Sequence, residues 1–431
     1  MIDPKSPVLA DLTLNDQPIP AIVEQHASEC ANLRGVRSRL VRAPDVRLRD
    51  LVRHDARISS HLDGLALAGK CGASLCSQGL ERPGAGEVFA VAVGALEAKD
   101  SLRLGELFAL GEVLPSAHRG LLSAFGWASA AYLRGTVQDL LNSTNSTRRA
   151  VGVAACSLHR VDPGIASVVR VEDSDPIIRA RVLRAAGELG LSSLVSICAA
   201  AIRDDDPVCQ FWAAWSAVLL GDRTVALEKL IDLALLPGQY QRTAFHLVLQ
   251  AAALPRAHRL LQWIAEDPGR LRLLIHGAGV AGDPAYVPWL IVQMDAGNVA
   301  PLAGEAFSFI TGEDLSASKL RRGKPEEAES GPNDDPNDPN VEMDEDDGLP
   351  WPDSAKIRVW WNANSHRFQP GERYFMGQPL NRDHCMKVLQ EGFQRQRIAA
   401  AHYLSLLNPG TPLFEWRAPA WRQRRLLTEM I

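Results

Sequence analysis

Apolar residues along the middle of this chain fall into alternating long and short runs, separated by turn residues at regular intervals. A proline or another turn residue recurs every 30 or 31 residues, and a small residue, most often glycine, follows it 14 positions later. The clearest pairs are Pro176/Gly190, Pro207/Gly221, Pro237/Ala251, Pro268/Gly282 and Asn298/Gly312, and weaker copies are Pro115/Ser129, Ser146/Arg160 and Gly84/Ala98. A fixed period of this length is typical of proteins built from stacked repeats. We therefore predict about seven or eight repeated units over residues 84–312.

The signals within one period predict a helical hairpin. Asp206 can accept the unpaired N–H groups of a helix start, and Pro207 follows at the first helical position, where its missing N–H costs nothing. Apolar and small residues then continue to Gly221, a residue type that ends helices in the left-handed conformation. A shorter apolar stretch, such as residues 192–204, forms the second helix. In two units this second helix has its own start signal, Asp162-Pro163 or Asp283-Pro284.

Small residues also recur at matching positions of the first helices. Ten positions after the repeat marker come Cys156, Ala186, Ala217, Ala278 and Ser308, with Leu247 as the exception. Small side chains let neighbouring helices approach closely, so that stacked hairpins bury one continuous core. The predicted fold is all-α, a HEAT-type α-solenoid.

Residues 1–83 lack the repeat spacing. Apolar periodicity over Ile22–Leu40 and Leu48–Leu67 predicts two helices there, which would cap the exposed end of the solenoid. The predicted organisation is therefore a helical cap at residues 1–83 followed by repeats at residues 84–312.

The end of the chain differs sharply in charge from the repeats. Residues 313–350 carry 13 Asp/Glu against 4 Lys/Arg, whereas residues 351–431 carry 6 against 12. Between residues 326 and 347 there are 11 acids and no base, a composition that cannot bury enough apolar surface to fold alone. We predict an acidic linker at 313–350, either free or laid over another surface. Residues 351–431 form a C-terminal module, with a helix at about Asp383–Leu407, that has its own core or docks on the solenoid.

Aromatic and basic side chains are concentrated in this module, and these residue types are enriched at binding hot spots. The candidate partner-binding residues are Trp351, Trp360, Trp361, Tyr374, Trp416, Trp421, Arg422, Arg424 and Arg425. The alternative is that the aromatics form the module's own core and that the arginines pair with the acidic stretch 326–347.

Signals for catalysis, metals and cofactors are weak in this sequence. His54, Asp55, His61 and Asp63 are ligand types for a divalent metal, but they lie among arginines as solvated helix-face residues do. The glycines of "GAGVAG" at 277–282 fall on repeat positions rather than after a strand, so we assign them to helix packing and a C-cap. No histidine is followed by glutamate, and no P-loop or nucleophile elbow is present. We predict no catalytic residues, no metal and no cofactor.

Charge and hydropathy narrow the class of partner. The repeats carry 19 Lys/Arg against 22 Asp/Glu, which gives no electrostatic footprint for nucleic acid. No stretch reaches the length of apolar sequence that a membrane helix needs, and the first residues lack an export signal. We expect a cytoplasmic protein that binds another protein and neither nucleic acid nor the membrane interior.

Nine segments of the chain are distinctive as whole strings. They are "HLDGLALAG" (61–69), "LHRVDPG" (158–164), "RAAGELG" (184–190), "FWAAWSAVLLGDR" (211–223), "GEAFSFITGEDL" (304–315), "GPNDDPNDPN" (331–340), "LPWPD" (349–353), "PGERYFMGQP" (370–379) and "PLFEWRAPAWRQRRLL" (412–427). In these segments the chain resembles a family of uncharacterised bacterial HEAT-repeat proteins whose genes are associated with type VI secretion and effector clusters. The likeness runs from about Ala21 to the C-terminus. The resemblance implies cytoplasmic work beside a secretion apparatus, as an adaptor that holds an effector or spike component.

Three functions are compatible with these observations. The favoured one is a non-catalytic binding scaffold, because solenoids create long surfaces and no chemistry is visible here. The second is an immunity or regulatory protein that neutralises a neighbouring toxin by blocking its activity. The third is a HEAT-like enzyme, a lyase or a hydroxylase, which a bound metal or chromophore would reveal.

The small-residue positions generate a stability prediction. If they are helix contacts, Ala217→Leu overpacks the stack and lowers the free energy of unfolding by about 1–3 kcal/mol. Glu228→Gln, on a polar stretch, should leave it nearly unchanged. Urea unfolding of both variants tests this, and equal stabilities would contradict the assigned repeat phase.

Overall fold

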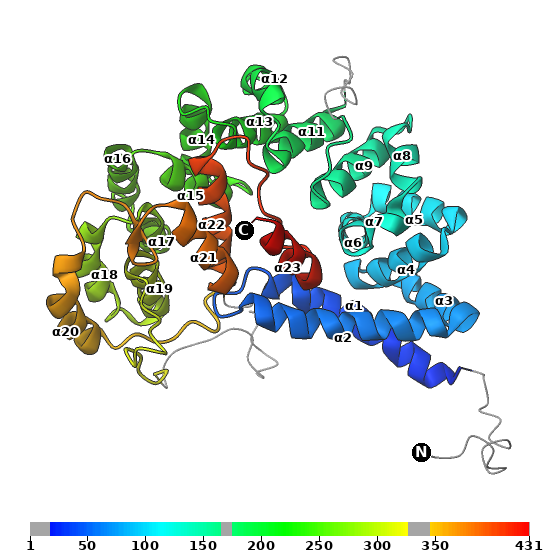
Figure 1. Ribbon diagram of the computed structural model, residues 1–431, viewed down its shortest axis with the longest axis horizontal. Coiled ribbons are helices and arrows are strands. Elements are labelled where there is room, and N and C mark those ends of the chain that lie inside the picture. The colour runs from blue at the N-terminus through cyan, green and yellow to red at the C-terminus, as the bar shows by residue number, and fades with distance from the viewer. Residues whose placement is uncertain (1–17, 165–174, 326–344, 431) are drawn as a thin grey trace, which may run out of the picture. The chain divides into compact units, whose positions relative to one another are not determined.

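The computed structural model describes residues 18–164, 175–325 and 345–430, and helices dominate them (Figure 1). The chain divides into two compact units, one made of residues 1–38 and 53–134 and the other of residues 39–52 and 135–431. The repeats from residue 135 onward and the C-terminal module thus share the second unit. Most of the acidic stretch and the helix predicted after Asp162-Pro163 lie outside the described residues.

The first unit contains the two predicted N-terminal helices and the first repeat hairpins. Its elements are α1 (Pro20–Leu40), α2 (Leu48–Leu67), α3 (Gly69–Gln78), η2 (Gly79–Glu81), α4 (Ala85–Ala98), α5 (Ser101–Val113), α6 (Pro115–Trp127) and α7 (Ala130–Leu133). The last residues of α1 and the first of α2 are counted with the second unit. Helix α4 packs against both α5 and α6, as consecutive hairpins of a solenoid do.

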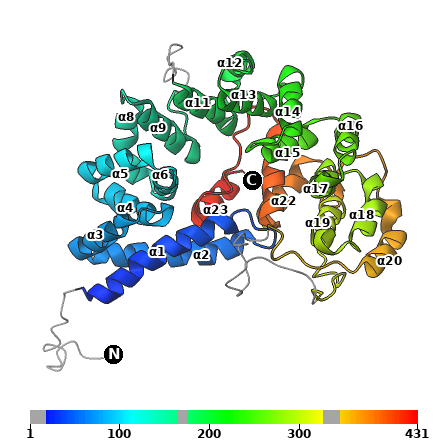
Figure 2. The same cartoon turned by 180° about the vertical axis from the view of Figure 1, so that it is seen from behind.

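The second unit holds the remaining repeats, followed by the C-terminal module. Its repeat elements are α8 (Thr136–Leu141), α9 (Ser146–Leu158), α11 (Pro176–Leu189), η3 (Ser192–Leu194), α12 (Val195–Ala201), α13 (Pro207–Leu219), α14 (Val225–Leu235), α15 (Gln241–Ala251), α16 (Leu254–Ala265), η4 (Pro268–Arg270), α17 (Leu271–Ala281), η5 (Pro284–Tyr286), α18 (Val287–Gln293), η6 (Gly297–Val299) and α19 (Ala300–Thr311). Each of the helices α9, α11, α13, α15, α17 and α19 packs against the next, and α12, α14, α16 and α18 lie on the outer side (Figures 1 and 2). The predicted all-α, HEAT-type solenoid is confirmed.

The predicted aspartate caps are present at the repeat markers Pro176, Pro207 and Pro268. The side chains of Asp175 and Asp206 each accept a backbone N–H at 2.9 Å, from Ile177 and Val208. The predicted helix start is wrong at Pro237, because a turn over Gly238–Gln241 follows the proline and α15 begins only at Gln241. At Pro268 and Asn298 a turn of 3₁₀ helix precedes the α-helix.

Small residues make close helix contacts, as predicted. A Cβ atom on Gly187 would lie 2.9 Å from the Cα atom of Ser216, and one on Gly279 would lie 2.7 Å from that of Ala306. Ala217 is fully buried. The glycines of "GAGVAG" therefore serve helix packing at Gly279 and a left-handed C-cap at Gly282, where φ is +78°.

The C-terminal module docks on the repeats rather than forming a separate body (Figure 1). Residues 382–407 lie on the inner side of the repeats, whereas residues 354–364 pack beside α18 on the outer side. Its elements are α20 (Ser354–Asn364), η7 (Ser365–Arg367), β1 (Tyr374–Phe375), β2 (Gln378–Pro379), α21 (Arg382–Glu391), α22 (Gln394–Leu407) and α23 (Ala420–Glu429). The short hairpin β1–β2 turns at Met376 and Gly377, both with positive φ. Helix α22 packs against α13 and α15, and β1 against α19.

The single helix predicted at about Asp383–Leu407 is wrong, since two helices, α21 and α22, replace it. The break occurs at Gly392 and Phe393, whose backbones are extended. At this break the chain pairs with residues 46–47. Arg47 forms an isolated antiparallel β-bridge with Phe393, and the N–H of Gln394 donates to the carbonyl of Val46 at 2.8 Å. A pairing with residues so distant in sequence leaves no local signal.

Glycines at the ends of the first helices face the docked C-terminal chain. A Cβ atom on Gly190 would lie 2.4 Å from the carbonyl oxygen of Gly410, and one on Gly282 would lie 2.3 Å from that of Tyr374. At Gly312 the corresponding distance, to Met376, is 2.5 Å. These residues thus provide the left-handed C-cap and also make room for another backbone.

This double role predicts that Gly282→Ala destabilises the protein more than the backbone cost alone. Gly371→Ala is a control, because Gly371 also has positive φ, +83°, but an added Cβ there meets no atom within 4 Å. Both variants bear the left-handed penalty of about 1–2 kcal/mol. We expect Gly282→Ala to cost at least about 1 kcal/mol more, with faster hydrogen exchange over residues 370–379. Equal stabilities and equal exchange would contradict the contact.

Candidate protein-interaction surfaces

The residues predicted to bind a partner do not form one surface. Tyr374 and Arg422 are buried, and Trp351 is half-buried. Trp360 and Trp361 are half-buried around Phe368, with ring centroids 6.4 and 5.5 Å from its ring. These positions belong to the packing of the module.

The remaining candidates lie further along the chain. The ring of Trp416 lies 5.5 Å from that of His402. Trp421 is 44% exposed on α23, and Arg424 and Arg425 are exposed on the same helix. Arg425 forms an exposed ion pair with Glu429, at 3.6 Å. Among the predicted residues, these three of α23 are therefore the accessible group.

Arg373 anchors the C-terminal chain to the ends of two repeat helices. Its guanidinium donates to the carbonyls of Leu249, Gln250 and Ala252 at 2.8, 2.6 and 2.7 Å, and to that of Ala281 at 3.1 Å. Carbonyls at a helix C-terminus lack intrahelical partners and carry partial negative charge, so a cation is favoured there. The sequence gives no sign of this role, because the acceptors lie more than 90 residues before the arginine.

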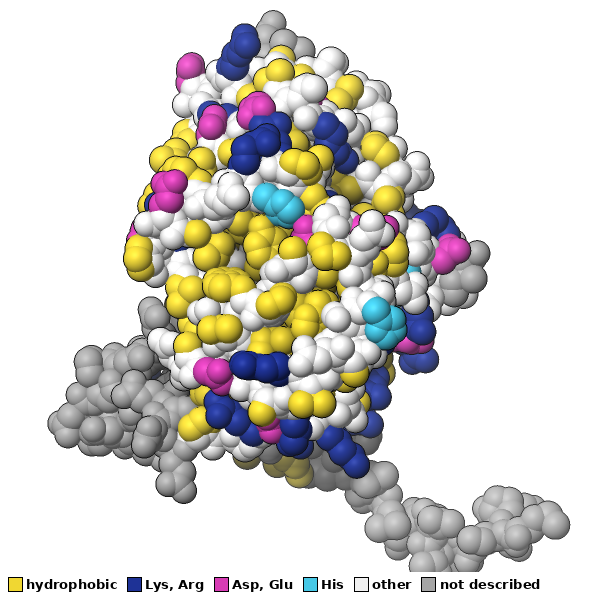
Figure 3. All heavy atoms as spheres, turned by 90° about the vertical axis from the view of Figure 1, so that its left-hand side faces the viewer, with side chains coloured by type: hydrophobic (Ala, Val, Ile, Leu, Met, Phe, Trp, Pro, Cys, Tyr) yellow, Lys and Arg dark blue, Asp and Glu magenta, His cyan; other side chains and the backbone are white. Residues whose placement is uncertain are grey.

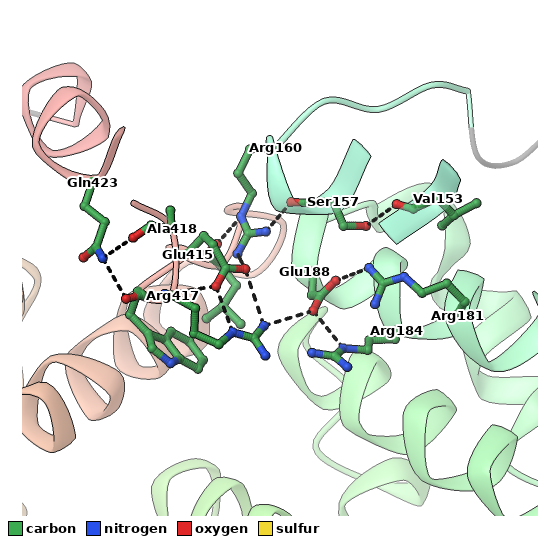
Figure 4. A network of polar contacts seen from close by, with 12 residues as sticks. Val153, Ser157, Arg160, Arg181, Arg184, Glu188, Glu415, Arg417, Ala418 and Gln423 are labelled. Atoms are coloured by element: carbon green, nitrogen blue, oxygen red, sulfur yellow. Dashed lines mark hydrogen bonds and ion pairs between the residues drawn. The ribbon is translucent and has the colours of Figure 1, made fainter. Parts of the chain in front are cut away.

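A buried network of charges anchors the chain at a second place (Figure 4). Glu415 pairs with Arg160 at 3.4 Å and with Arg417 at 2.9 Å, and Arg417 reaches Glu188 at 3.8 Å. Glu188 also pairs with Arg184 at 2.8 Å and with Arg181. Arg160 stands at a repeat position where other units have glycine, and its φ is also positive, +57°.

The charges of this network compensate one another. Burial acts to raise the pKa of Glu188, but Arg181, Arg184, Arg160 and Arg417 outweigh it and hold the pKa well below its ordinary value. The pKa of Glu415 is likewise lowered, against burial, by Arg417 and Arg160. Both carboxylates therefore stay ionised, and each fixes the C-terminal chain to the repeats.

With these anchors, the C-terminal chain occupies the inner ends of α11, α15, α17 and α19. Leu413 donates to the carbonyl of Glu188 at 3.0 Å, Tyr374 to Gly282 at 2.8 Å and Met376 to Phe309 at 2.7 Å. The inner side of these repeats is thus already bound by the protein's own chain. A partner of the second unit has to be sought on a different face.

The outer face of α16, α18 and α20 carries exposed apolar side chains. Trp263, Val292 and Val359, one from each helix, are 41%, 57% and 71% exposed. His258 of α16 contacts the ring of Tyr286 at 5.6 Å, which joins α16 to the segment before α18. Figure 3 views the molecule from this side and shows hydrophobic side chains gathered around a hollow. We call the face formed by α16, α18, α20 and η7 the outer apolar face.

The charged residues within the outer apolar face are all basic, because its four elements contain no aspartate or glutamate. Their bases are Arg256, Arg259, Lys356, Arg358 and Arg367. Two of the five are paired with acids from outside these elements, Arg256 with Glu228 and Lys356 with Asp353. Figure 3 also shows acidic side chains around this view, so the apolar centre has a border of mixed charge.

The metal-ligand types noted in the first unit have ordinary partners. His54 Nε2 lies 2.8 Å from the carbonyl of Leu33, Asp55 accepts from Arg37 at 2.6 Å, and His61 lies 3.0 Å from His26. Within the described residues no three His, Cys, Asp or Glu side chains are grouped so as to hold a metal ion. Contacts between packed helices account for the positions of His54, Asp55 and His61.

Comparison with known proteins supports a HEAT-repeat protein. Residues 167–250 match the family model described as HEAT repeats. No match is found among curated proteins or among solved structures. In the described part of the chain, no helix has the length and hydropathy required to cross a bilayer. HEAT repeats indicate a scaffold for protein interaction.

The buried network generates a prediction about Glu188. Glu188→Gln removes the carboxylate that Arg181, Arg184 and Arg417 share, so we expect a loss of about 3–5 kcal/mol in the free energy of unfolding. Glu429→Gln, which removes only the exposed pair with Arg425, should change it by less than about 1 kcal/mol. Urea unfolding measures both, and limited proteolysis should cut the Glu188→Gln variant faster near residues 408–418. Similar stabilities would mean that the network does not hold the chain in place.

Proposed function

We propose that the protein is a non-catalytic scaffold that holds a protein partner on its outer apolar face. The observation that carries this proposal is the exposure of Trp263, Val292 and Val359 on a face whose own elements contribute only basic residues. Large exposed apolar areas on soluble proteins mark interaction sites. The inner side of the same repeats is occupied by the C-terminal chain, which favours the outer side for binding.

The composition of the face specifies its occupant. A partner that fits it carries apolar side chains at its centre, to cover the tryptophan and valines, and carboxylates around them. Arg358 and Arg367 are exposed and can meet such carboxylates. Charge complementarity of this kind speeds association and sets the orientation of the partner.

The resemblance to HEAT-repeat proteins of type VI secretion clusters supports a particular class of partner. We propose an effector or spike component of the secretion apparatus, held by this scaffold in the cytoplasm before loading. If the partner is instead a toxin whose activity stops on binding, the protein acts as an immunity protein. Assaying the partner's activity with and without the scaffold separates these two roles.

The test compares two matched pairs of substitutions. Val292→Glu with Val359→Glu places two carboxylates on the outer apolar face, and should abolish association with the partner. Leu102→Glu with Val113→Glu is the control, because these side chains are 76% and 73% exposed on α5, in the first unit. The partner is identified from the native complex by mass spectrometry, and its affinity for each variant is then measured with purified proteins.

The outcome separates the outer apolar face from other surfaces. Loss of binding in the first pair alone supports the proposal. Equal binding by both pairs would overturn it. Arg424→Glu with Arg425→Glu then tests the accessible group on α23, where lost binding at a thermal stability within about 1 kcal/mol of wild type would place the interface there.

A further inference from the structure

Three arginines from three helices converge on two adjacent acidic residues. Arg242 of α15 pairs with Glu345, and Arg272 of α17 pairs with Asp346. Arg395 of α22 lies 3.7 Å from Asp346 and also donates to the backbone carbonyl of Glu345. The acidic pair is therefore bound by side chains and by a backbone contact.

The site has a second carboxylate and two uncharged imidazoles nearby. Glu305 pairs with Arg395 at 2.6 Å. The rings of His246 and His276 are stacked with centroids 4.3 Å apart. Burial, together with Arg242 and other neighbours, lowers the pKa of His246 to about 3, and burial and His246 lower that of His276. The positive charge of the site thus comes from the arginines alone.

The two acidic residues are held with different strengths. Glu345 and Arg242 have side chains 63% and 49% exposed, and exposed ion pairs contribute little, about 0–1 kcal/mol. Asp346 is only 6% exposed and contacts two arginines. Glu345 is therefore the easier of the two to displace, and its removal frees Arg242 first.

Removal of both acidic residues would leave the site positively charged. Three guanidinium groups, those of Arg242, Arg272 and Arg395, would then face the carboxylate of Glu305 alone. Arg242 and Arg272 are each 49% exposed, so an incoming ligand can reach them from solvent. The site now holds the carboxylates of two consecutive residues, Glu345 and Asp346. It therefore accepts a peptide with adjacent acidic side chains.

We propose that Arg242, Arg272 and Arg395 form a binding site for a short acidic peptide segment of a partner, and that Glu345 and Asp346 occupy it as an intramolecular competitor. An acidic peptide is favoured over nucleic acid because the observed occupants are carboxylates and because Glu305 adds a negative charge beside the site. The site is separate from the outer apolar face. It stands even if that face binds no partner.

The experiment uses the full chain and a fluorescent peptide with the sequence of residues 341–348, "VEMDEDDG", which carries five carboxylates. When Glu345 and Asp346 occupy the site in most molecules, the apparent affinity for an added peptide falls in proportion to the fraction of sites that is free. We therefore expect the E345Q/D346N variant to bind the peptide at least about tenfold more tightly than the wild type does, with binding weakened by salt. Fluorescence anisotropy at two salt concentrations measures this.

Two further substitutions in the E345Q/D346N background locate the site. Arg272→Glu should reverse the gain in affinity, whereas Arg203→Glu, on an exposed arginine outside the site, should preserve it. Arg272→Gln replaces the first variant if thermal unfolding shows that Arg272→Glu is not folded, and E345Q alone serves if the double variant is not folded.

Three outcomes would overturn the proposal. The first is equal affinity of the wild type and the E345Q/D346N variant for the peptide, including no binding by either. The second is binding that the Arg272 substitution leaves unchanged. The third is equally tight binding of a single-stranded oligonucleotide of the same charge, which would make the site a general polyanion site.

Discussion

The carbonyl groups at the ends of the repeat helices need partners, and the C-terminal chain supplies them. Every helix leaves its last carbonyls without intrahelical hydrogen bonds. In the second unit, Arg373 alone satisfies four of these carbonyls, and the backbone of Tyr374 and Met376 contacts two more. The glycines at Gly282 and Gly312 make this possible, because any side chain there would meet the docked backbone. The repeats and the C-terminal module are therefore parts of one folding unit.

Buried charge gives this docking its precision. Apolar contacts tolerate small shifts, whereas Glu188 and Glu415 have to be matched by arginines from both the repeats and the C-terminal chain. Leaving either carboxylate unmatched in the interior is costly, so the chain has a single favourable register. The same docking covers the inner side of these repeats, so a partner cannot bind there. The outer apolar face and the arginine site around Asp346 remain as places where another molecule can bind.

The sequence predicted those features whose causes are local. Asp206, Pro207 and the C-cap glycines act within a few residues of themselves, so their spacing revealed the repeats. Apolar periodicity, which is equally local, revealed the two helices of residues 20–67. The break at Gly392 was missed because its cause is a pairing with residues 46–47. Neither Arg373 nor Arg160 is distinguished from any other arginine until distant carbonyls and carboxylates are brought beside it.

The candidate site was predicted only in composition. Arg422, Arg424 and Arg425 were expected to pair with the acidic stretch 326–347, most of which lies outside the described residues. The described acids Glu345 and Asp346 pair instead with Arg242, Arg272 and Arg395. The arginines of α23 that the sequence singled out stay a prediction. The net negative charge of a segment predicts that it will pair with basic residues. It does not tell which of the many arginines of the chain lie close to that segment in the folded protein.

The position of Arg417 and Glu415 near the end of the chain also matters for the order of synthesis. Residues 135–312 leave the ribosome long before residues 373–417, so Glu188, Arg160, Arg181 and Arg184 are made while Glu415 and Arg417 are still missing. Domains of this size begin to fold during synthesis. The repeats therefore pass through a stage in which Arg160, Arg181 and Arg184 compensate Glu188 without Arg417, with the helix ends bare until residues 373–417 arrive. A nascent chain stopped before residue 373 would present to the cell a face that the finished protein never shows.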